Sequence, residues 1–149
     1  MKRNQYIYTP RVGYYQLTDF NFAQFLQWNV NTNTFCPFHR RNIHGNWHAP
    51  EQYTSGNLSE KVDVFSLGNV LYSLLTQTTA WKVVGKHKIE ETIVAGRRAP
   101  IPDELLHSTD PFHVYTIQAM NQCWIQDPLE RPSAYDISQI LAQGLATIG

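Results

Sequence analysis

The stretch from Val62 to Leu75 constrains the fold more than any other part of the chain. Nine of its fourteen residues are apolar or tyrosine, and they cover every side of a helical wheel. A helix that is apolar all round must be buried all round. This one is too short to cross a bilayer. We therefore expect it to be the central buried helix of a globular domain, with Ser59 as its N-cap.

Asp63 is unusual in such a helix, because burying an unpaired carboxylate is strongly unfavourable. Two interpretations are open. Either the carboxylate is buried and paired with hydrogen-bond donors, or it faces solvent at the helix N-terminus, where the helix dipole favours a negative charge.

The composition is that of a single globular domain. The chain has 149 residues, of which 42% are hydrophobic and 16% charged, and its formal net charge is zero. This balance provides no basic surface for nucleic acid and no polybasic segment for a membrane. No transmembrane segment or signal peptide is predicted, and Cys36 and Cys123 do not form a disulfide framework. We therefore expect a cytoplasmic protein.

The N-terminal third is predicted to be a hairpin followed by a long loop. Residues 6–9 and 14–18 are aromatic and β-branched and flank a Pro-Arg-Val-Gly turn, which is typical of a β-hairpin. Residues 22–28 fit either a short strand or a helix. Residues 29–50 are rich in Asn, Thr, Pro and Gly and are predicted to be a loop, whose length indicates a functional role.

Three more helices are expected after the central one. Residues 86–95 are amphipathic and end at Gly96. A helix capped by Asp110 is expected to bury six residues and to end at Asp127-Pro128. The six are Phe112, Tyr115, Ala119, Met120, Cys123 and Trp124. The last helix begins at Ser133 and has an apolar face of Ile137, Ile140, Leu141 and Leu145.

Four motifs in this order resemble the C-terminal lobe of a protein kinase. Leu17–Asn21 resembles the D-F-G metal-binding motif, and Ala49–Glu51 resembles A-P-E. Asp63–Gly68 is similar to D-x-W-S-x-G of the central helix of that lobe. Cys123–Ser133 is similar to C-W-x-x-D-P-x-x-R-P-S before the last helices. The resemblance implies a mainly α (α+β) fold, with a short β-hairpin and four to six helices around a central buried helix.

The resemblance also implies roles for individual residues. Asp19 would bind the Mg²⁺ that bridges the phosphates of ATP. Phe20 would pack in the apolar column that separates active from inactive geometry. Glu51 would pair with Arg131, and Asp63 would accept N–H bonds from the catalytic loop.

The first five residues resemble the end of the kinase catalytic loop. Lys2 would contact the transferred phosphate, and Gln5 stands where Asn binds the second Mg²⁺. Lys2 is typical of serine/threonine kinases, whereas Trp47 and its neighbours resemble the substrate loop of tyrosine kinases or tyrosine-kinase-like proteins. The acceptor residue is therefore open.

The sequence also departs from the kinase pattern. Met1 stands about where the catalytic aspartate is expected, and Asn21 replaces the glycine of D-F-G. No glycine-rich loop, strand lysine or partner glutamate is found. We therefore expect residues 1–149 to be a partial kinase domain without an N-lobe. It would comprise the end of the catalytic loop, an activation segment over residues 19–51 and a helical lobe over residues 59–149. A fragment of this kind is expected to be inactive alone.

Two alternatives differ from a catalytic kinase. The first is a non-catalytic pseudokinase or scaffold, in which the helix at 86–95 docks a partner. The second is a zinc module formed by Cys36, His39, His44 and His48.

Two further features are a pair of loop threonines and a pair of adjacent arginines. Thr32 and Thr34 lie where activation-loop phosphorylation occurs, and a phosphate there would pair with Arg40 or Arg41. The Arg97-Arg98 pair is expected to be solvated.

Overall fold

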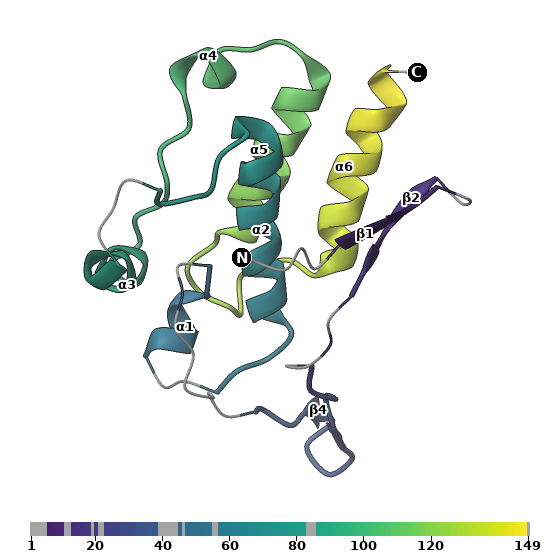
Figure 1. Ribbon diagram of the computed structural model, residues 1–149. Helices are drawn as coiled ribbons and strands as arrows, with labels where there is room; N and C mark the ends of the chain where they lie inside the picture. The colour runs from purple at the N-terminus through teal and green to yellow at the C-terminus, as the bar shows by residue number, and fades with distance from the viewer. Residues whose placement is uncertain are drawn as a thin grey trace.

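The computed structural model describes residues 6–10, 13–18, 20, 23–38, 45, 47–54, 57–82 and 86–148. Within these ranges, six helices lie beside two small antiparallel sheets (Figure 1). The predicted mainly helical fold with a short hairpin is confirmed.

The first sheet is the expected hairpin. β1 (Tyr6–Thr9) pairs with β2 (Tyr14–Leu17), with Tyr6 opposite Leu17 and Thr9 opposite Tyr14. Gly13, which directly precedes β2, has a φ of 70°, a left-handed angle that glycine adopts without steric cost.

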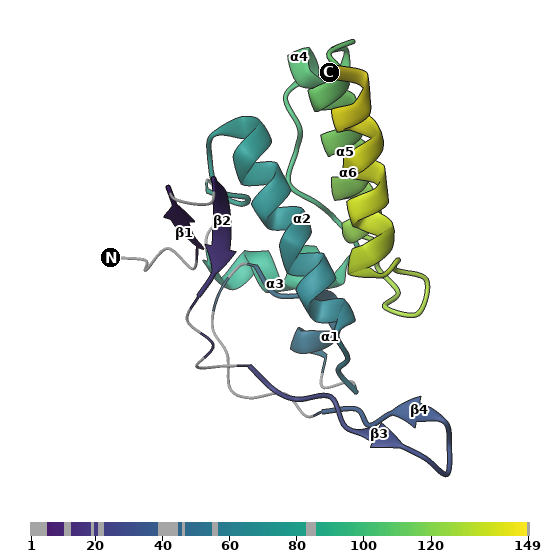
Figure 2. The same ribbon diagram turned by 90° about the vertical axis from the view of Figure 1, so that its right-hand side faces the viewer.

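A second, smaller hairpin lies inside the segment that was predicted to be a loop. β3 (Trp28–Asn29) pairs with β4 (Thr34–Phe35), and the Asn29 side chain accepts the N–H groups of Asn31 and Thr32 in the turn. This hairpin projects away from the helices (Figure 2). Residues 23–27 form neither of the two elements predicted for 22–28, although Trp28 begins β3 and the Gln27 carbonyl accepts the Cys36 N–H at 2.7 Å.

The central helix, α2, spans Lys61–Thr76 and packs beside α5 (Pro111–Cys123), which in turn packs beside α6 (Ala134–Ile148). The N-cap of α2 is Glu60 rather than Ser59, although the Ser59 hydroxyl still accepts the Lys61 N–H at 3.4 Å. The approach of α2 to the end of α5 requires Gly68, since a Cβ there would lie 2.7 Å from the Trp124 ring.

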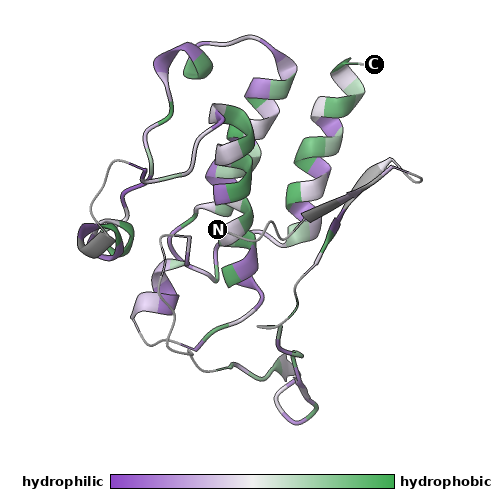
Figure 3. Ribbon diagram, viewed as in Figure 1, coloured by the Kyte–Doolittle hydropathy of each residue, from purple (hydrophilic) through white to green (hydrophobic). Residues whose placement is uncertain are grey.

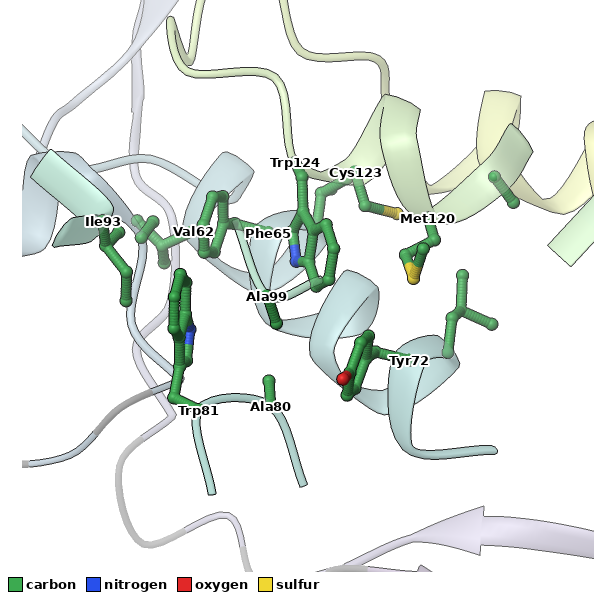
Figure 4. Close-up of a cluster of buried hydrophobic side chains, with 14 of the residues drawn as sticks. Val62, Phe65, Tyr72, Ala80, Trp81, Ile93, Ala99, Met120, Cys123 and Trp124 are labelled. Atoms are coloured by element: carbon green, nitrogen blue, oxygen red, sulfur yellow. The ribbon is translucent and has the colours of Figure 1, made fainter. Parts of the chain in front are cut away.

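The buried core brings side chains of α2 together with those of residues 80–81, 93, 99 and 120–124 (Figure 4). Phe65 and Trp124 belong to this core, as do Trp81 and Ile93 of α3 (Lys86–Val94). Trp124 and Tyr72 have ring centroids 5.8 Å apart. The predicted central position of α2 is thus confirmed.

The prediction that α2 is buried all round is wrong at Leu74. Asp63 is also exposed, which is the second of its two interpretations, because it lies on the first turn away from the core residues Val62 and Phe65. Leu74 is 57% exposed, because it lies at an open apolar groove between α2, α5 and α6. All three helices carry hydrophobic residues, which are green in Figure 3. The groove has a volume of about 220 Å³ and is lined by Leu71, Leu74, Phe112, Tyr115, Thr116, Leu141, Gly144, Leu145 and Ile148.

The same groove explains two other errors. Phe112 and Leu145 were predicted to be buried but are 48% and 70% exposed, because they lie at its open edge. The predicted caps of α5 and α6 are confirmed: Asp110 accepts the Phe112 N–H at 2.8 Å, and Ser133 and Asp136 exchange hydrogen bonds at the start of α6.

The segment between α3 and α5 contains a short helix, α4 (Asp103–Leu106), that the sequence pattern did not indicate. α5 also ends at Cys123, earlier than predicted. Among the described residues, no helix is long and apolar enough to cross a lipid bilayer.

Candidate functional site

A buried ion pair joins two of the sequence motifs. Glu51 lies in the short helix α1 (Pro50–Tyr53), and Arg131 lies in the loop between α5 and α6. One guanidinium nitrogen of Arg131 donates to Glu51 Oε1 at 2.8 Å and the other to Oε2 at 3.2 Å. Arg131 is 1% exposed and Glu51 8%. The pairing that the resemblance implied is therefore present, in the bidentate form that favours arginine over lysine.

Arg131 also uses its remaining donors. Its Nε donates to the Ile125 carbonyl at 3.0 Å, and its terminal nitrogens donate to the carbonyls of Lys61 at 2.6 Å and Gln126 at 3.4 Å. In return, Lys61 Nζ donates to the Arg131 carbonyl at 2.6 Å. All five N–H groups of the guanidinium are thus satisfied, as a fully buried arginine requires.

A second arginine, Arg98, completes this cluster. The guanidinium carbons of Arg98 and Arg131 lie 5.0 and 5.1 Å from the centroid of the Phe65 ring, which is within cation–π range. Arg98 also donates to the Trp124 carbonyl at 2.8 and 3.0 Å. Burial, and secondly the charge of Arg131, lower the pKa of Arg98 to about 10, while Glu51 opposes the shift. Arg98 is therefore half-buried and bonded, not solvated as predicted.

The segment before α1 is attached to the middle of α2. The Trp47 carbonyl accepts hydrogen bonds from Ser66 Oγ at 3.1 Å and from Asn69 Nδ2 at 3.0 Å. Two residues further, Ala49 is fully buried. The Tyr53 hydroxyl donates to the Gly45 carbonyl at 2.7 Å.

The Trp47 side chain is 42% exposed and lies against Gly45, where an added Cβ would be 2.7 Å from the indole. An aromatic side chain is thus presented to solvent from a backbone that is bonded to the helical core.

Phe20 and the two threonines lie apart from this cluster. Phe20 is 64% exposed and no described element covers its ring, so its packing in an apolar column stays a prediction. Thr32 and Thr34 lie in and beside the exposed β3–β4 turn, with their hydroxyl oxygens 2.8 Å apart.

Asp63 makes no hydrogen bond through its carboxylate within the described part of the chain. Although the residue is exposed overall, partial desolvation of its carboxylate by the surrounding chain, and secondly the charge of Glu60, raise the pKa of Asp63. Its expected donors belong to the catalytic loop, and the part of that loop predicted in this chain, within residues 1–5, lies outside the described residues.

Four other predicted residues also lie outside the described ranges: Lys2, Gln5, Asp19 and Asn21. Two of the four candidate zinc ligands, His39 and His44, lie outside them as well. Among the residues that the structure does describe, no three His, Cys, Asp or Glu side chains are grouped for a metal. The zinc alternative therefore receives no support.

Sequence reasoning missed Arg98, Ser66 and Asn69. Only Asn69 gives a usable signal: an amide in an otherwise apolar helix needs a hydrogen-bond partner. Nothing in the sequence distinguishes Arg98 from its exposed neighbour Arg97.

A family model described as "Protein kinase domain" matches residues 2–143. The chain is 33% identical over 97 residues to mitogen-activated protein kinase kinase kinase 7 of Homo sapiens. These aligned residues cover 64% of this chain and 15% of that protein. It is 30% identical over 87 residues to the RGS domain-containing serine/threonine-protein kinase A of Dictyostelium discoideum, covering 58% of this chain and 7% of the relative.

Another similar protein of Dictyostelium discoideum is named as a probable inactive serine/threonine-protein kinase. It is 32% identical over 97 residues, covering 65% of this chain and 3% of the relative. The chain thus spans only a small part of the length of each of these proteins.

Proposed function

Because this chain belongs to the protein kinase family, we propose that it supplies the helical lobe and activation segment of an enzyme that transfers phosphate from ATP to a protein side chain. In this proposal, residues 19–51 form the activation segment and residues 59–149 the helical lobe. The segment around Trp47 faces the polypeptide substrate.

The Glu51–Arg131 cluster carries the proposal. It joins the A-P-E motif to the R-P-S motif across 80 residues of sequence and includes the first residue of α2 through the Lys61 carbonyl. Phosphoryl transfer depends on positioning more than on covalent chemistry by the protein. A segment that is fixed to the core by a fully satisfied buried arginine is suited to that task.

The catalytic parts of the proposal rest on the resemblance alone. Asp19 and Gln5 would bind Mg²⁺ with ATP, and Lys2 would contact the transferred phosphate. A Mg²⁺ ion held by these two side chains would supply positive charge against the negative charge of the phosphates. We further propose that residues 1–149 alone do not transfer phosphate, since no general base in them corresponds to the catalytic aspartate.

The test measures phosphate transfer from γ-labelled ATP to mixed protein substrates by the purified 149-residue chain. We expect no transfer above background. A rate that is abolished by Asp19→Ala would refute the inactivity of the isolated chain. In any longer polypeptide that contains these residues, Asp19→Ala is expected to abolish transfer, and full activity of that variant would refute the kinase role of Asp19.

Phosphorylation of Thr32 or Thr34 is the regulation we propose for this segment. Both hydroxyls are exposed on a projecting hairpin, where a kinase can reach them. A phosphate there carries close to two negative charges at neutral pH and would order the neighbouring segment through Arg40 or Arg41. Mass spectrometry of the native protein tests this, and unmodified threonines in both resting and stimulated cells would refute it.

A non-catalytic scaffold is the second candidate. Its support is that the buried cluster uses none of the catalytic residues, and that one relative is named as inactive. The 5′ sequence of the transcript separates the candidates: an in-frame H-x-D motif and a glycine-rich loop ahead of Met1 would favour catalysis. For either candidate we propose a cytoplasmic location, which suits the free thiols of Cys36 and Cys123.

A further inference from the structure

Asn69 is the only amide side chain in α2, and it is 9% exposed. Leaving a buried amide without a hydrogen-bond partner is unfavourable, so the partners of this side chain indicate why it is there. Its Nδ2 donates to the Trp47 carbonyl at 3.0 Å, across 22 residues of sequence. Since a carbonyl only accepts, the NH₂ group and not the amide oxygen must face Trp47.

Ser66 donates to the same carbonyl oxygen at 3.1 Å. Positions 66 and 69 are three residues apart and therefore lie on one face of the helix. Two donors use both lone pairs of the Trp47 oxygen and fix the plane of the peptide group that follows Trp47. The direction of the chain from Trp47 into α1 is thus set by two side chains of the central helix.

The residues that precede this peptide group also restrict the position of Trp47. The Trp47 indole lies against Gly45, and Tyr53 closes residues 45–53 through the Gly45 carbonyl. The indole is nevertheless 42% exposed. A change in the Trp47 peptide plane would therefore move an exposed aromatic ring.

We propose that Asn69, assisted by Ser66, is a positioning residue that sets the orientation of Trp47 on the surface facing the polypeptide substrate. The link to a substrate rests on the proposed function. The positioning itself does not, because it concerns only the two hydrogen bonds to the Trp47 carbonyl.

The test uses the 149-residue chain labelled with 5-fluorotryptophan and observed by fluorine NMR, with the Trp47 signal assigned by Trp47→Phe. Asn69→Asp keeps the shape of the side chain but replaces the donor with an acceptor when ionised. At pH 7 we expect the Trp47 signal to move by more than its line width and the other three signals to stay. Ser73→Ala is the matched control, because the Ser73 hydroxyl bonds only to the Asn69 carbonyl within the helix.

Acidification provides a rescue. When the introduced carboxyl is protonated, its O–H again donates to the Trp47 carbonyl, so the signal should return toward the position found in the unsubstituted chain. His48 is the titratable group next to Trp47, with ring centroids 5.4 Å apart, and its effect is removed by the same titration of the unsubstituted chain. Asn69→Leu, which has no proton to gain, should show no return.

An unchanged Trp47 signal in Asn69→Asp at pH 7, or an equal response in Asn69→Leu at low pH, would overturn the inference. Circular dichroism checks that each variant folds. Ser66→Ala, at a half-buried position, decides the case if Asn69→Asp is unfolded: it should move the Trp47 signal alone, and no movement would refute the positioning role. A shifted signal together with undiminished capture of a degenerate Ser/Thr/Tyr peptide library would instead count against the substrate-facing role of Trp47.

Discussion

Replacing Arg131 by methionine should be among the most destabilising single changes in this chain. It leaves the Glu51 carboxylate, 8% exposed, without either of its two donors. It also removes donors from the carbonyls of Lys61, Ile125 and Gln126. Removing one partner of a buried ion pair costs about 3–5 kcal/mol. For a chain of this size each kcal/mol lowers Tm by about 2–4 °C, so we expect a fall of about 6–20 °C.

Urea denaturation followed by circular dichroism measures the loss in free energy of unfolding. Arg97→Met is the matched control, because Arg97 is exposed and should stay within about 0.5 kcal/mol of the unsubstituted chain. Adding Glu51→Leu to Arg131→Met removes the unpaired carboxylate. The double variant should therefore be more stable than the sum of the two single effects predicts, by about 0.5–3 kcal/mol.

A loss below about 1 kcal/mol for Arg131→Met would refute the reasoning, since even the carbonyl donors alone are worth that much. Strict additivity in the double variant would refute the ion pair as its cause.

Three further changes test other parts of the fold. Gly68→Ala should cost about 1–3 kcal/mol in urea denaturation, because the new methyl group overlaps Trp124 and this outweighs the gain in helix propensity. Burial raises the pKa of the Cys123 thiol to about 12, so a thiol reagent at pH 8 should modify Cys36 but should modify Cys123 only when the chain is unfolded. Rapid modification of both cysteines in the folded chain would contradict this. Asp63→Asn should raise the free energy of unfolding at pH 7, because a raised pKa in the folded chain means that folding disfavours the ionised carboxylate. The gain should vanish as the pH falls below 3.8, the ordinary pKa of an aspartate, since the carboxyl is then protonated in both the folded and the unfolded chain. A constant difference between pH 3 and pH 7 would contradict the shift.

The features that sequence reasoning recovered share a local or strongly patterned cause. The helices from Lys61, Pro111 and Ala134 begin at or next to Ser, Asp and Pro signals that act within four residues. The ion pair of Glu51 with Arg131 followed from the motifs that contain them, because its partners are 80 residues apart and no local pattern connects them.

The features that were missed depend on tertiary contacts. Arg98 and Arg97 are chemically identical, and only the packing of Phe65 and Trp124 makes the first a structural residue. The exposure of Leu145 depends on the open groove between three helices, which helical periodicity does not describe. A two-residue strand pair such as β3–β4 is shorter than the period-two pattern needs in order to be detected.

The arginine at position 131 has a consequence for how this chain tolerates insertions and deletions. Its guanidinium bonds to the Ile125 and Gln126 carbonyls, and its own N–H bonds to the Asp127 carbonyl, so the loop is folded back onto Arg131. Those acceptors are backbone atoms, which a side-chain substitution preserves but an added or lost residue displaces. We therefore expect an insertion or deletion between residues 125 and 131 to be more disruptive than one in the projecting turn at residues 30–33.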